Sequence, residues 1–307
     1  MISLYTAKER VDYMDQHGID AAIEQFSVTR SSLERYERLI RDSLRPAPQK
    51  LPNILVFDVE TSPMAVFVWG LYKQRINHNN VIQDWHLISW AAKWLMSGEV
   101  MSDVLTPTEA RKHDDSRIVK KIWNLLETAN LVIAHNGKAF DLRKLNARFM
   151  LNGLKPPSPY QVIDTLVESR KMAAHSSHRL DYLGQIMYNK NKLDTDFELW
   201  KKCYVGDQES LDYMVKYNKI DVELLEEVYL FMRGWIKSHP NVGLYMDIES
   251  PVCSNCGSEK LHPIESYSTT VGQYDTFRCG DCGGICRMRT TNVPIKKRKS
   301  LTVSVAR

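Results

Sequence analysis

Two carboxylates follow a short apolar run early in the chain. The run ILVF at 54–57 is typical of a buried strand, and Asp58 and Glu60 come directly after it. Residues two apart in a strand project from the same face, so both side chains point the same way. Like charges this close repel unless a cation lies between them, and hard oxygen ligands favour Mg²⁺ or Mn²⁺. The alternative is that Asp58 caps the strand end and Glu60 is exposed to solvent.

Two later acids lie beside apolar residues, where a lone carboxylate is costly. Asp141 ends the stretch NGKAFD, just after an expected strand and turn and near the start of an expected helix. Tyr217 and Asp221 are four residues apart in YNKID, which places them on one helical face. Each acid alone could be a cap or a surface group, but the segments together form a pattern.

The three segments resemble the three exonuclease motifs of the DEDD superfamily of 3′–5′ exonucleases. FDVET supplies the D-x-E motif, Asn136 to Asp141 supplies N-x₃-F-D, and YNKID supplies the Y-x₃-D of the tyrosine subtype. Proofreading domains of DNA polymerases share this set, as do free-standing bacterial and phage exonucleases. The resemblance covers roughly 53–236 and implies an RNase H-like fold, an α/β architecture in which helices flank a mixed sheet.

The resemblance also implies two Mg²⁺ or Mn²⁺ ions per active site, with a role for each motif residue. Asp58 would bridge both ions, and Glu60 and Asp221 would complete the site on the nucleophile side. Asp141 would hold the second ion, partly through water. Tyr217 would orient the attacking water, because a phenol with an ordinary pKa near 10 is a poor base.

Two further polar residues lie near these motifs. Asn136 is a candidate for contact with the substrate strand, and a turn-stabilising asparagine is the alternative. Asp164 in VIDTL is a possible fifth acid. The family does not require it, so we leave it outside the predicted site.

The cysteines form two C-x₂-C pairs near the C-terminal end. CSNCG contains Cys253 and Cys256, and CGDCG contains Cys279 and Cys282, with 22 residues between the pairs. This spacing predicts a zinc ribbon with one structural Zn²⁺, because a module this small cannot build a core of its own. Two disulfides are the competing interpretation, which a reducing compartment disfavours. The ribbon could bind nucleic acid or dock a replication or repair protein.

The N-terminal segment, 1–44, is expected to be helical and resembles a helix-turn-helix. DAAIEQF would be the first helix and SVTRSSLERYERL the turn and second helix, with Arg30 and Arg35 as candidate DNA contacts. A plain helical hairpin that mediates protein contact is the alternative. A proline-rich linker at 45–52 would follow.

Charge is distributed unevenly along the chain. Of the total of +4, residues 285–307 carry +7 without any acid and 1–50 carry 0, which leaves −3 for 51–284. A basic tail indicates a polyanionic partner, and a solvated tail is compatible with this. The candidate substrate contacts in the tail are Lys296, Lys297, Arg298 and Lys299.

The expected domains are a nuclease domain at 53–240, a ribbon at 251–287 and a basic tail at 288–307. Within the nuclease domain, MAVFVWGLY is β-like, and a long amphipathic helix starting at LDYMVKY is expected to stop near 239–241.

The best candidate for a membrane span, SWAAKWLM, is interrupted by Lys93, so membrane partners are excluded. The first residues lack the apolar core of a signal peptide, which predicts a cytoplasmic protein of a bacterium or a phage-infected host.

These features together predict a metal-dependent 3′–5′ exonuclease that acts on DNA, on single strands or 3′ ends. An RNA 3′-end exonuclease on the same fold is one alternative, since no motif separates ribose from deoxyribose. The other is a DNA-binding adaptor whose nuclease-like domain is only a scaffold. The complete acid set argues against the adaptor, because a scaffold has no need of four costly carboxylates.

Overall fold

The computed structural model describes residues 4–43, 51–190 and 193–305. The chain divides into two compact units, 1–50 and 51–307, which are described separately. Most of the expected linker at 45–52 lies outside the described residues. The expected subdivision of the second unit into nuclease domain, ribbon and tail stays a prediction.

The first unit contains three described helices. They are α1 (Leu4–His17), α2 (Ile19–Phe26) and α3 (Arg30–Ser43). Of these, α2 and α3 lie where the sequence predicts the two helices of the helix-turn-helix. Small and apolar side chains form the contacts among them: Ala7, Val11, Ala22 and Leu33 are buried. The chain turns between α2 and α3 at Ser27, which adopts a left-handed conformation with φ of 49°.

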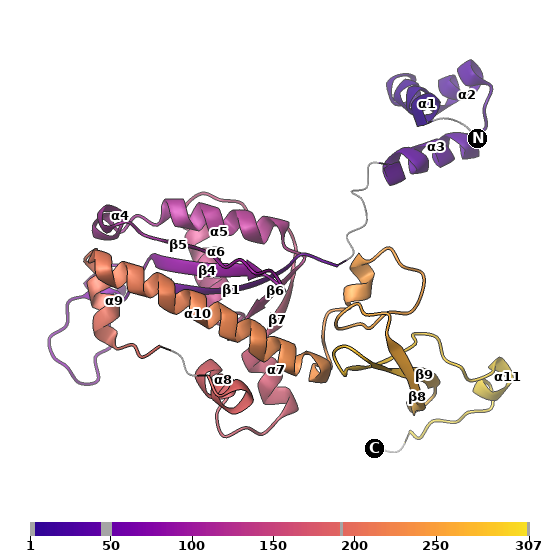
Figure 1. Ribbon diagram of the computed structural model, residues 1–307. Helices are drawn as coiled ribbons and strands as arrows, with labels where there is room; N and C mark the ends of the chain where they lie inside the picture. Colours follow the sequence, from indigo (N-terminus) through magenta and orange to yellow (C-terminus); the bar gives the residue numbers. More distant parts are fainter. Residues whose placement is uncertain (1–3, 44–50, 191–192, 306–307) are drawn as a thin grey trace. The chain divides into compact units, whose positions relative to one another are not determined.

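A five-stranded mixed sheet forms the centre of the second unit (Figure 1). Its strands are β1 (Ile54–Thr61), β4 (Leu87–Trp94), β5 (Met101–Val104), β6 (Leu131–Ala134) and β7 (Gln161–Asp164). The order is β5-β4-β1-β6-β7. β1 is antiparallel to β4 and parallel to β6, and β6 is parallel to β7. The central strand is thus the one that ends in the first two acids.

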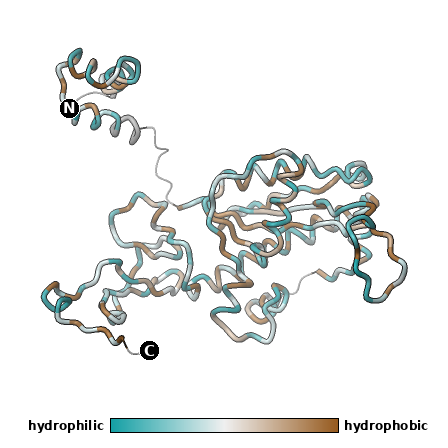
Figure 2. Tube along the Cα trace, turned by 180° about the vertical axis from the view of Figure 1, so that it is seen from behind, coloured by the Kyte–Doolittle hydropathy of each residue, from teal (hydrophilic) through white to brown (hydrophobic). Residues whose placement is uncertain are grey.

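Helices cover both faces of this sheet, and successive side chains of β1 point to opposite faces. Leu55, Phe57 and Val59 pack into a core with α4 (Pro107–Lys112), α5 (Ser116–Thr128) and α6 (Asp141–Leu151). Ile54 and Val56 pack into a second core with α8 (Leu180–Tyr188) and α10 (Gln208–Met232). Two shorter helices, α7 (Thr165–Met172) and α9 (Phe197–Tyr204), complete this part. Figure 2 shows hydrophobic residues concentrated in the sheet between these layers.

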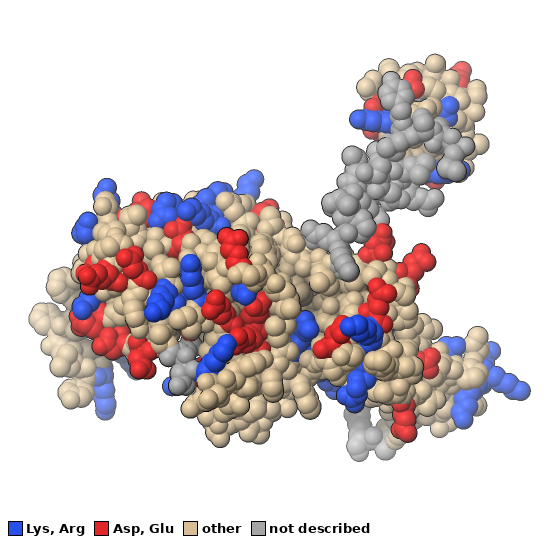
Figure 3. Space-filling model, viewed as in Figure 1, with Lys and Arg blue, Asp and Glu red and all other residues tan. Residues whose placement is uncertain are grey.

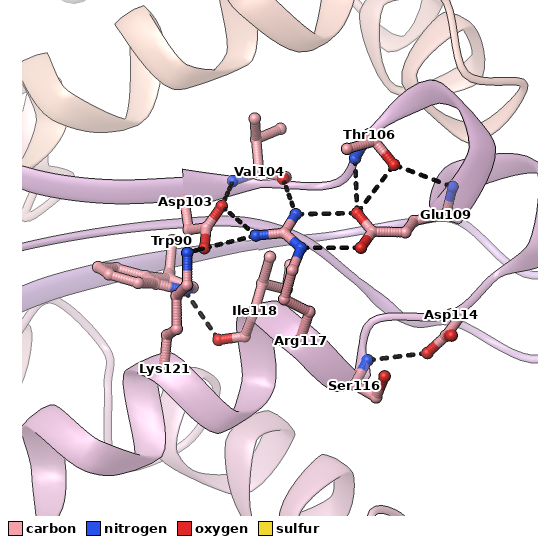
Figure 4. A network of polar contacts seen from close by, with 10 residues as sticks. All are labelled: Trp90, Asp103, Val104, Thr106, Glu109, Asp114, Ser116, Arg117, Ile118 and Lys121. Carbon is pink, nitrogen blue, oxygen red and sulfur yellow. Dashed lines mark hydrogen bonds and ion pairs between the residues drawn. The ribbon is translucent and has the colours of Figure 1, made fainter.

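Ion pairs between charged side chains link the helices to the sheet at two places. Arg117 of α5 donates to both Asp103 oxygens at 2.7 Å and to Glu109, which joins β5, α4 and α5 (Figure 4). Lys93 of β4 forms a buried ion pair of 2.5 Å with Glu226 of α10. Removing one partner of a buried pair leaves an uncompensated charge, so the Lys93–Glu226 pair holds α10 against the sheet.

The β-like run at 64–72 forms a strand over only part of its length. Only Ala65–Val66 forms a strand, β2, which pairs with β3 (Val81–Gln83) through a hairpin that includes the 3₁₀ turn η1 (His78–Asn80). The residues between lack a partner strand among the described residues, and apolar character alone does not make a strand without one.

The C-terminal part forms a small three-stranded antiparallel sheet. It contains β8 (Leu261–Ser268), β9 (Gln273–Cys279) and β10 (Ile285–Arg287), followed by the short helix α11 (Ile295–Arg298). The long helix α10 ends at Met232, earlier than predicted, and the 3₁₀ turns η2 (Arg233–Trp235) and η3 (Val242–Tyr245) lead into this sheet. The architecture confirms the predicted mixed sheet flanked by helices.

Candidate active site and cysteine cluster

Three carboxylates converge between β1 and α10. Because Ile54 and Val56 face α10, the alternation of the strand brings Asp58 and Glu60 to the same face. On α10, Asp221 lies in the buried stripe of the helix and is 2 % exposed. One carboxylate oxygen from each of the three residues lies within 4.8 Å of the others. Three hard oxygen donors this close fit a divalent cation such as Mg²⁺ or Mn²⁺.

A buried asparagine holds the first of these acids. The Nδ2 of Asn218 donates to Oδ2 of Asp58 at 2.6 Å, and its Oδ1 accepts from the Ser89 hydroxyl of β4 at 3.3 Å. Asn218 is fully buried and lies one turn before Asp221 on α10. Its amide therefore joins β1, β4 and α10 at the site. The sequence analysis missed this residue, although it lies within YNKID and three positions before an acid on the same face.

Asp141 approaches from the opposite side of the sheet. It is the first residue of α6, and its Oδ1 accepts from the backbone N–H of Val59, between the two strand acids, at 3.3 Å. Burial, opposed by backbone hydrogen bonds, raises the pKa of the Asp141 carboxyl to about 7, and the nearby Asp164 charge acts in the same direction. Desolvation disfavours the ionised form of the Asp141 carboxyl, and a cation bound nearby would stabilise that ionised form. Asp141 lies beside the three converging carboxylates and is not one of them.

Tyr217 lies on α10 one turn before Asp221, and its hydroxyl hydrogen-bonds the Asp221 carboxylate. Burial, and then the charges of Asp221, Glu60 and Asp58, raise the pKa of the phenol well above 10, so Tyr217 keeps its proton at neutral pH. The ring makes an edge-to-face contact with Trp200, whose Nε1 donates to Glu60 at 3.2 Å. Trp200 comes from α9, and no local sequence signal predicts its contact with Glu60.

The loop that precedes Asp141 is held by Asp164, which is not among the predicted site residues. Asp164 accepts from the backbone N–H groups of Asn136 and Lys138, each at 3.0 Å, and also caps α7 through Leu166 and Val167. Asn136 itself has a left-handed φ of 66°, which asparagine tolerates better than most residues. This geometry matches the turn-forming alternative for Asn136. Its side chain also lines the cleft beside the acids.

A polar cleft of about 970 Å³ opens beside Tyr217. Its walls come from the loop with His135 and Asn136 and from α7 and α8 with the segments around them, and they include Arg170, His178 and Arg179. Two guanidinium groups suit a phosphate backbone, which arginine binds bidentately, and the carboxylates of Asp181 and Asp194 line the same cleft. The sequence analysis did not predict these two arginines, since neither lies in a motif.

The four predicted cysteines also come together. One sulfur from each of Cys253, Cys256, Cys279 and Cys282 lies within 4.8 Å of the others. The Sγ atoms are 3.6 Å apart in the pair Cys253–Cys282 and in the pair Cys256–Cys279. Disulfide sulfurs would be about 2.05 Å apart. A tetrahedral Zn²⁺ with Zn–S bonds of about 2.3 Å separates its sulfurs by about 3.7 Å, so the cluster fits zinc.

The cysteine cluster packs against the end of the helix that carries Tyr217 and Asp221. The Nδ2 of Asn255 donates to the backbone oxygens of Arg233 and Ile236, at 2.9 and 3.3 Å. At Gly234, an added Cβ would lie 2.2 Å from the backbone oxygen of Cys282. Only glycine allows so close an approach. The knuckles therefore rest on the turn that follows α10.

The predicted substrate-binding residues lie apart from the acids or in a separately described unit. Lys296, Lys297 and Arg298 are exposed on the short helix α11, and the exposed Lys299 follows it. Figure 3 shows basic side chains on the C-terminal part of the molecule. In the N-terminal unit, Arg30 lies 3.7 Å from Asp20, and Arg35 is exposed. The structure contains these basic groups at the surface, and their role in binding stays a prediction.

The fold of the second unit is RNase H-like, and a family model of the RNase H superfamily matches residues 94–232. The matched segment includes Asp141, Tyr217 and Asp221 and begins after the two acids of β1. No curated protein matches the chain. A domain of this fold implies a nucleic-acid hydrolase that uses divalent metal ions. Within the described ranges, no helix has both the length and the apolar character needed to cross a membrane.

Proposed function

We propose that the protein is a metal-dependent 3′–5′ exonuclease of the DEDD superfamily, tyrosine subtype, that hydrolyses phosphodiester bonds of DNA. The observation that carries this proposal is the convergence of Asp58, Glu60 and Asp221, whose carboxylate oxygens lie within 4.8 Å of one another. Asp141 accepts a hydrogen bond from the backbone N–H of Val59, between the two strand acids. Four carboxylates gathered around one strand end are costly for a fold to keep. A pair of bound cations offsets this cost, which the adaptor alternative leaves unexplained.

The residues of the candidate active site would divide the work of this mechanism among them. Asp58, Glu60, Asp141 and Asp221 would hold two Mg²⁺ or Mn²⁺ ions. When bound, such ions lower the pKa of a water molecule and neutralise charge on the phosphate oxygens. Asn218 orients Asp58, and Trp200 orients Glu60.

Tyr217 positions the attacking water. Its raised pKa keeps the phenol neutral, so it does not act as a general base. The hydroxyl hydrogen-bonds Asp221, and its oxygen can also accept a hydrogen bond from the water. The polar cleft beside Tyr217 would receive the 3′ end, with Arg170 and Arg179 on its phosphates.

The appendages complete the proposal. One Zn²⁺ in the cysteine cluster would be structural, since all four ligand positions are filled by sulfur. The basic turn of α11 and the N-terminal helices would recruit long DNA electrostatically. The N-terminal unit favours DNA over RNA in this proposal. A replication or repair protein docking on the ribbon is the alternative role for that part.

The direct test uses labelled single-stranded DNA and RNA, each with a label at the 5′ or the 3′ end. We expect metal-dependent hydrolysis that EDTA abolishes, a ladder of shortened products from 5′-labelled strands, and release of the terminal nucleotide from 3′-labelled strands. Faster cleavage of RNA would favour the RNA exonuclease. Binding without hydrolysis in Mg²⁺ or Mn²⁺ would favour the adaptor.

A further inference from the structure

The hairpin that follows β1 exposes large apolar side chains at its tip. In residues 67–76, here called the aromatic loop, Phe67 is 73 % exposed, Trp69 is 100 % exposed and Tyr72 is 89 % exposed. Leu71 between them is also exposed, at 94 %. Single exposed apolar residues are ordinary, but a contiguous group of this kind marks an interaction site.

Hydrogen bonds order the hairpin that presents these rings. The backbone N–H of Phe67 donates to the oxygen of Asn80 at 2.9 Å, and Asn77 caps the 3₁₀ turn through its side chain. At the tip, Nε2 of Gln74 donates to the backbone oxygen of Tyr72 at 2.8 Å. The hairpin is thus paired at its base, and one local hydrogen bond lies near its tip.

The charge of this segment favours an anionic partner. Residues 61–83 contain Lys73 and Arg75, both exposed, and no aspartate or glutamate. The loop is the purple segment that projects beside α9 in Figure 1. On the face drawn in Figure 3, the corresponding lobe at the left edge shows no acidic side chain.

The aromatic loop is continuous with the candidate active site. Its hairpin starts from the strand that carries Glu60, where the pairing of β1 with β4 shifts register between Glu60 and Thr61. A second hollow of about 390 Å³ lies along this connection. Trp200 lines it together with Ser62 and Phe197. Trp200 also donates to Glu60, so one side chain borders both the hollow and the acids, and Asp196 lines the hollow as well.

We propose that the aromatic loop is a stacking platform for unpaired bases of the nucleic-acid strand whose end lies in the active site. This inference rests on the proposed function, because it takes the substrate strand to be the ligand. Every base has a π-face that stacks on tryptophan or tyrosine, so aromatic rings flanked by cations bind single strands without reading their sequence. Lys73 and Arg75 are placed to contact the phosphates of the same strand.

Binding of a fluorescein-labelled 20-mer of thymidine, measured with the full chain in its zinc-bound form and without added Mg²⁺ or Mn²⁺, tests the proposal. Trp69→Ala and Tyr72→Ala should each weaken binding by about fivefold or more, since stacking on one ring is worth about 1–3 kcal/mol per base. Leu71→Ala is the matched control, because it removes similar apolar surface without a π-face and should bind as wild type. Trp69→Phe should keep most of the affinity. These side chains are exposed, so the substitutions should leave the fold intact.

A second readout separates this inference from the proposed function. The p-nitrophenyl ester of thymidine 5′-monophosphate is too short to reach the aromatic loop, so wild type and Trp69→Ala should hydrolyse it equally in Mn²⁺. Hydrolysis with equal 20-mer affinities in wild type, Trp69→Ala and Tyr72→Ala would overturn the platform and leave the nuclease standing. A loss as large in Leu71→Ala would also overturn it, because the patch would then be a general apolar surface of the kind a protein binds. Failure of wild type to hydrolyse any substrate would overturn the proposed function itself.

Discussion

The side chain of Asn218 donates a 2.6 Å hydrogen bond from Nδ2 to Oδ2 of Asp58, across the interface between α10 and β1. The same amide accepts from Ser89, so neither its position nor its flip state can change without breaking a contact. A neutral donor stabilises the charged form of Asp58 while leaving its other oxygen to a cation. This contact ties the first acid to the helix that carries Asp221.

Asn218→Ala should reduce hydrolysis by roughly 10- to 100-fold, the range typical for a residue that orients a metal ligand. Ser89→Ala is the matched control and should have a smaller effect, because Asn218 keeps its contact with Asp58. Turnover at several Mn²⁺ concentrations is the measurement, and saturating Mn²⁺ should restore part of the rate. A rate equal to wild type at limiting Mn²⁺ would show that Asp58 does not depend on this amide.

Tyr217→Phe should slow single-turnover hydrolysis severalfold or more and leave the affinity for Mn²⁺ nearly unchanged. The substitution removes the hydroxyl that positions water and keeps the edge-to-face contact with Trp200. Asp221→Ala is the comparison, since it removes a ligand and should lose Mn²⁺ affinity. If both variants lost affinity equally, Tyr217 would have a metal-binding role in place of a positioning one.

Gly234→Ala should disturb the cysteine cluster and, through it, the end of α10. The new Cβ would collide with the backbone oxygen of Cys282, which cannot move as a side chain can. We expect a loss of bound zinc measured by native mass spectrometry and a lower melting temperature. Gly98→Ala is the control, because an added Cβ there meets no atom within 4 Å.

Loss of zinc by Cys253→Ser should likewise loosen 251–287, and hydrogen exchange should show greater opening at 228–236, where Asn255 contacts the backbone. Unchanged exchange there in a zinc-free protein would contradict the coupling. Two disulfides with no zinc would overturn the metal assignment.

His86 should make the protein less stable as the pH falls. Burial lowers the pKa of its imidazole to about 4, and the positive charges of His113 and Arg148 add to this effect against the attraction of Asp115. In the unfolded chain the His86 imidazole is protonated below a pH of about 6.5, whereas in the folded protein it is protonated only as the pH approaches 4. Stability is therefore retained above pH 6.5 and lost as the pH falls from there to about 4.

The size of the effect follows from the separation of the two pKa values and is about 3 kcal/mol at most. Urea unfolding of wild type and His86→Gln between pH 7.5 and 4.5 is the measurement. The variant should lose part of this pH dependence, whatever its stability at pH 7.5. Identical slopes in the two proteins would assign the acid sensitivity to other groups.

The parts of the site that depend on local spacing could be predicted from the sequence. Strand alternation places Asp58 and Glu60 together, and one helical turn links Tyr217 to Asp221, so each relation follows from short-range geometry. Contacts between distant segments could not be predicted in this way. Trp200 reaches Glu60 only because α9 packs beside the strand end, 140 positions along the chain.

The fold, too, has parts that local sequence patterns predict and parts that depend on contacts between distant segments. Helix and strand periodicity predicts the layers, because each element must bury one face. Periodicity failed at 64–72, where β-prone residues form a hairpin tip, since strand formation needs a partner that composition does not reveal. Asp164 shows a further limit. A carboxylate that caps a helix and closes a loop has the same local sequence as a metal ligand.

Single-turnover hydrolysis of a 5′-labelled single strand in Mn²⁺ by Asp58→Asn tests the central assignment most directly. Asparagine keeps the shape of the side chain and removes the charge that a cation needs. Asp212→Asn is the matched control, because Asp212 is an exposed carboxylate of the same helix as Asp221 and lies outside both the converging carboxylates and the cleft. We expect Asp58→Asn to lose more than the roughly 100-fold that an outer partner costs, with strand binding retained, and Asp212→Asn to cut at nearly the wild-type rate. Near-normal cleavage by Asp58→Asn would contradict a metal centre at Asp58, Glu60 and Asp221.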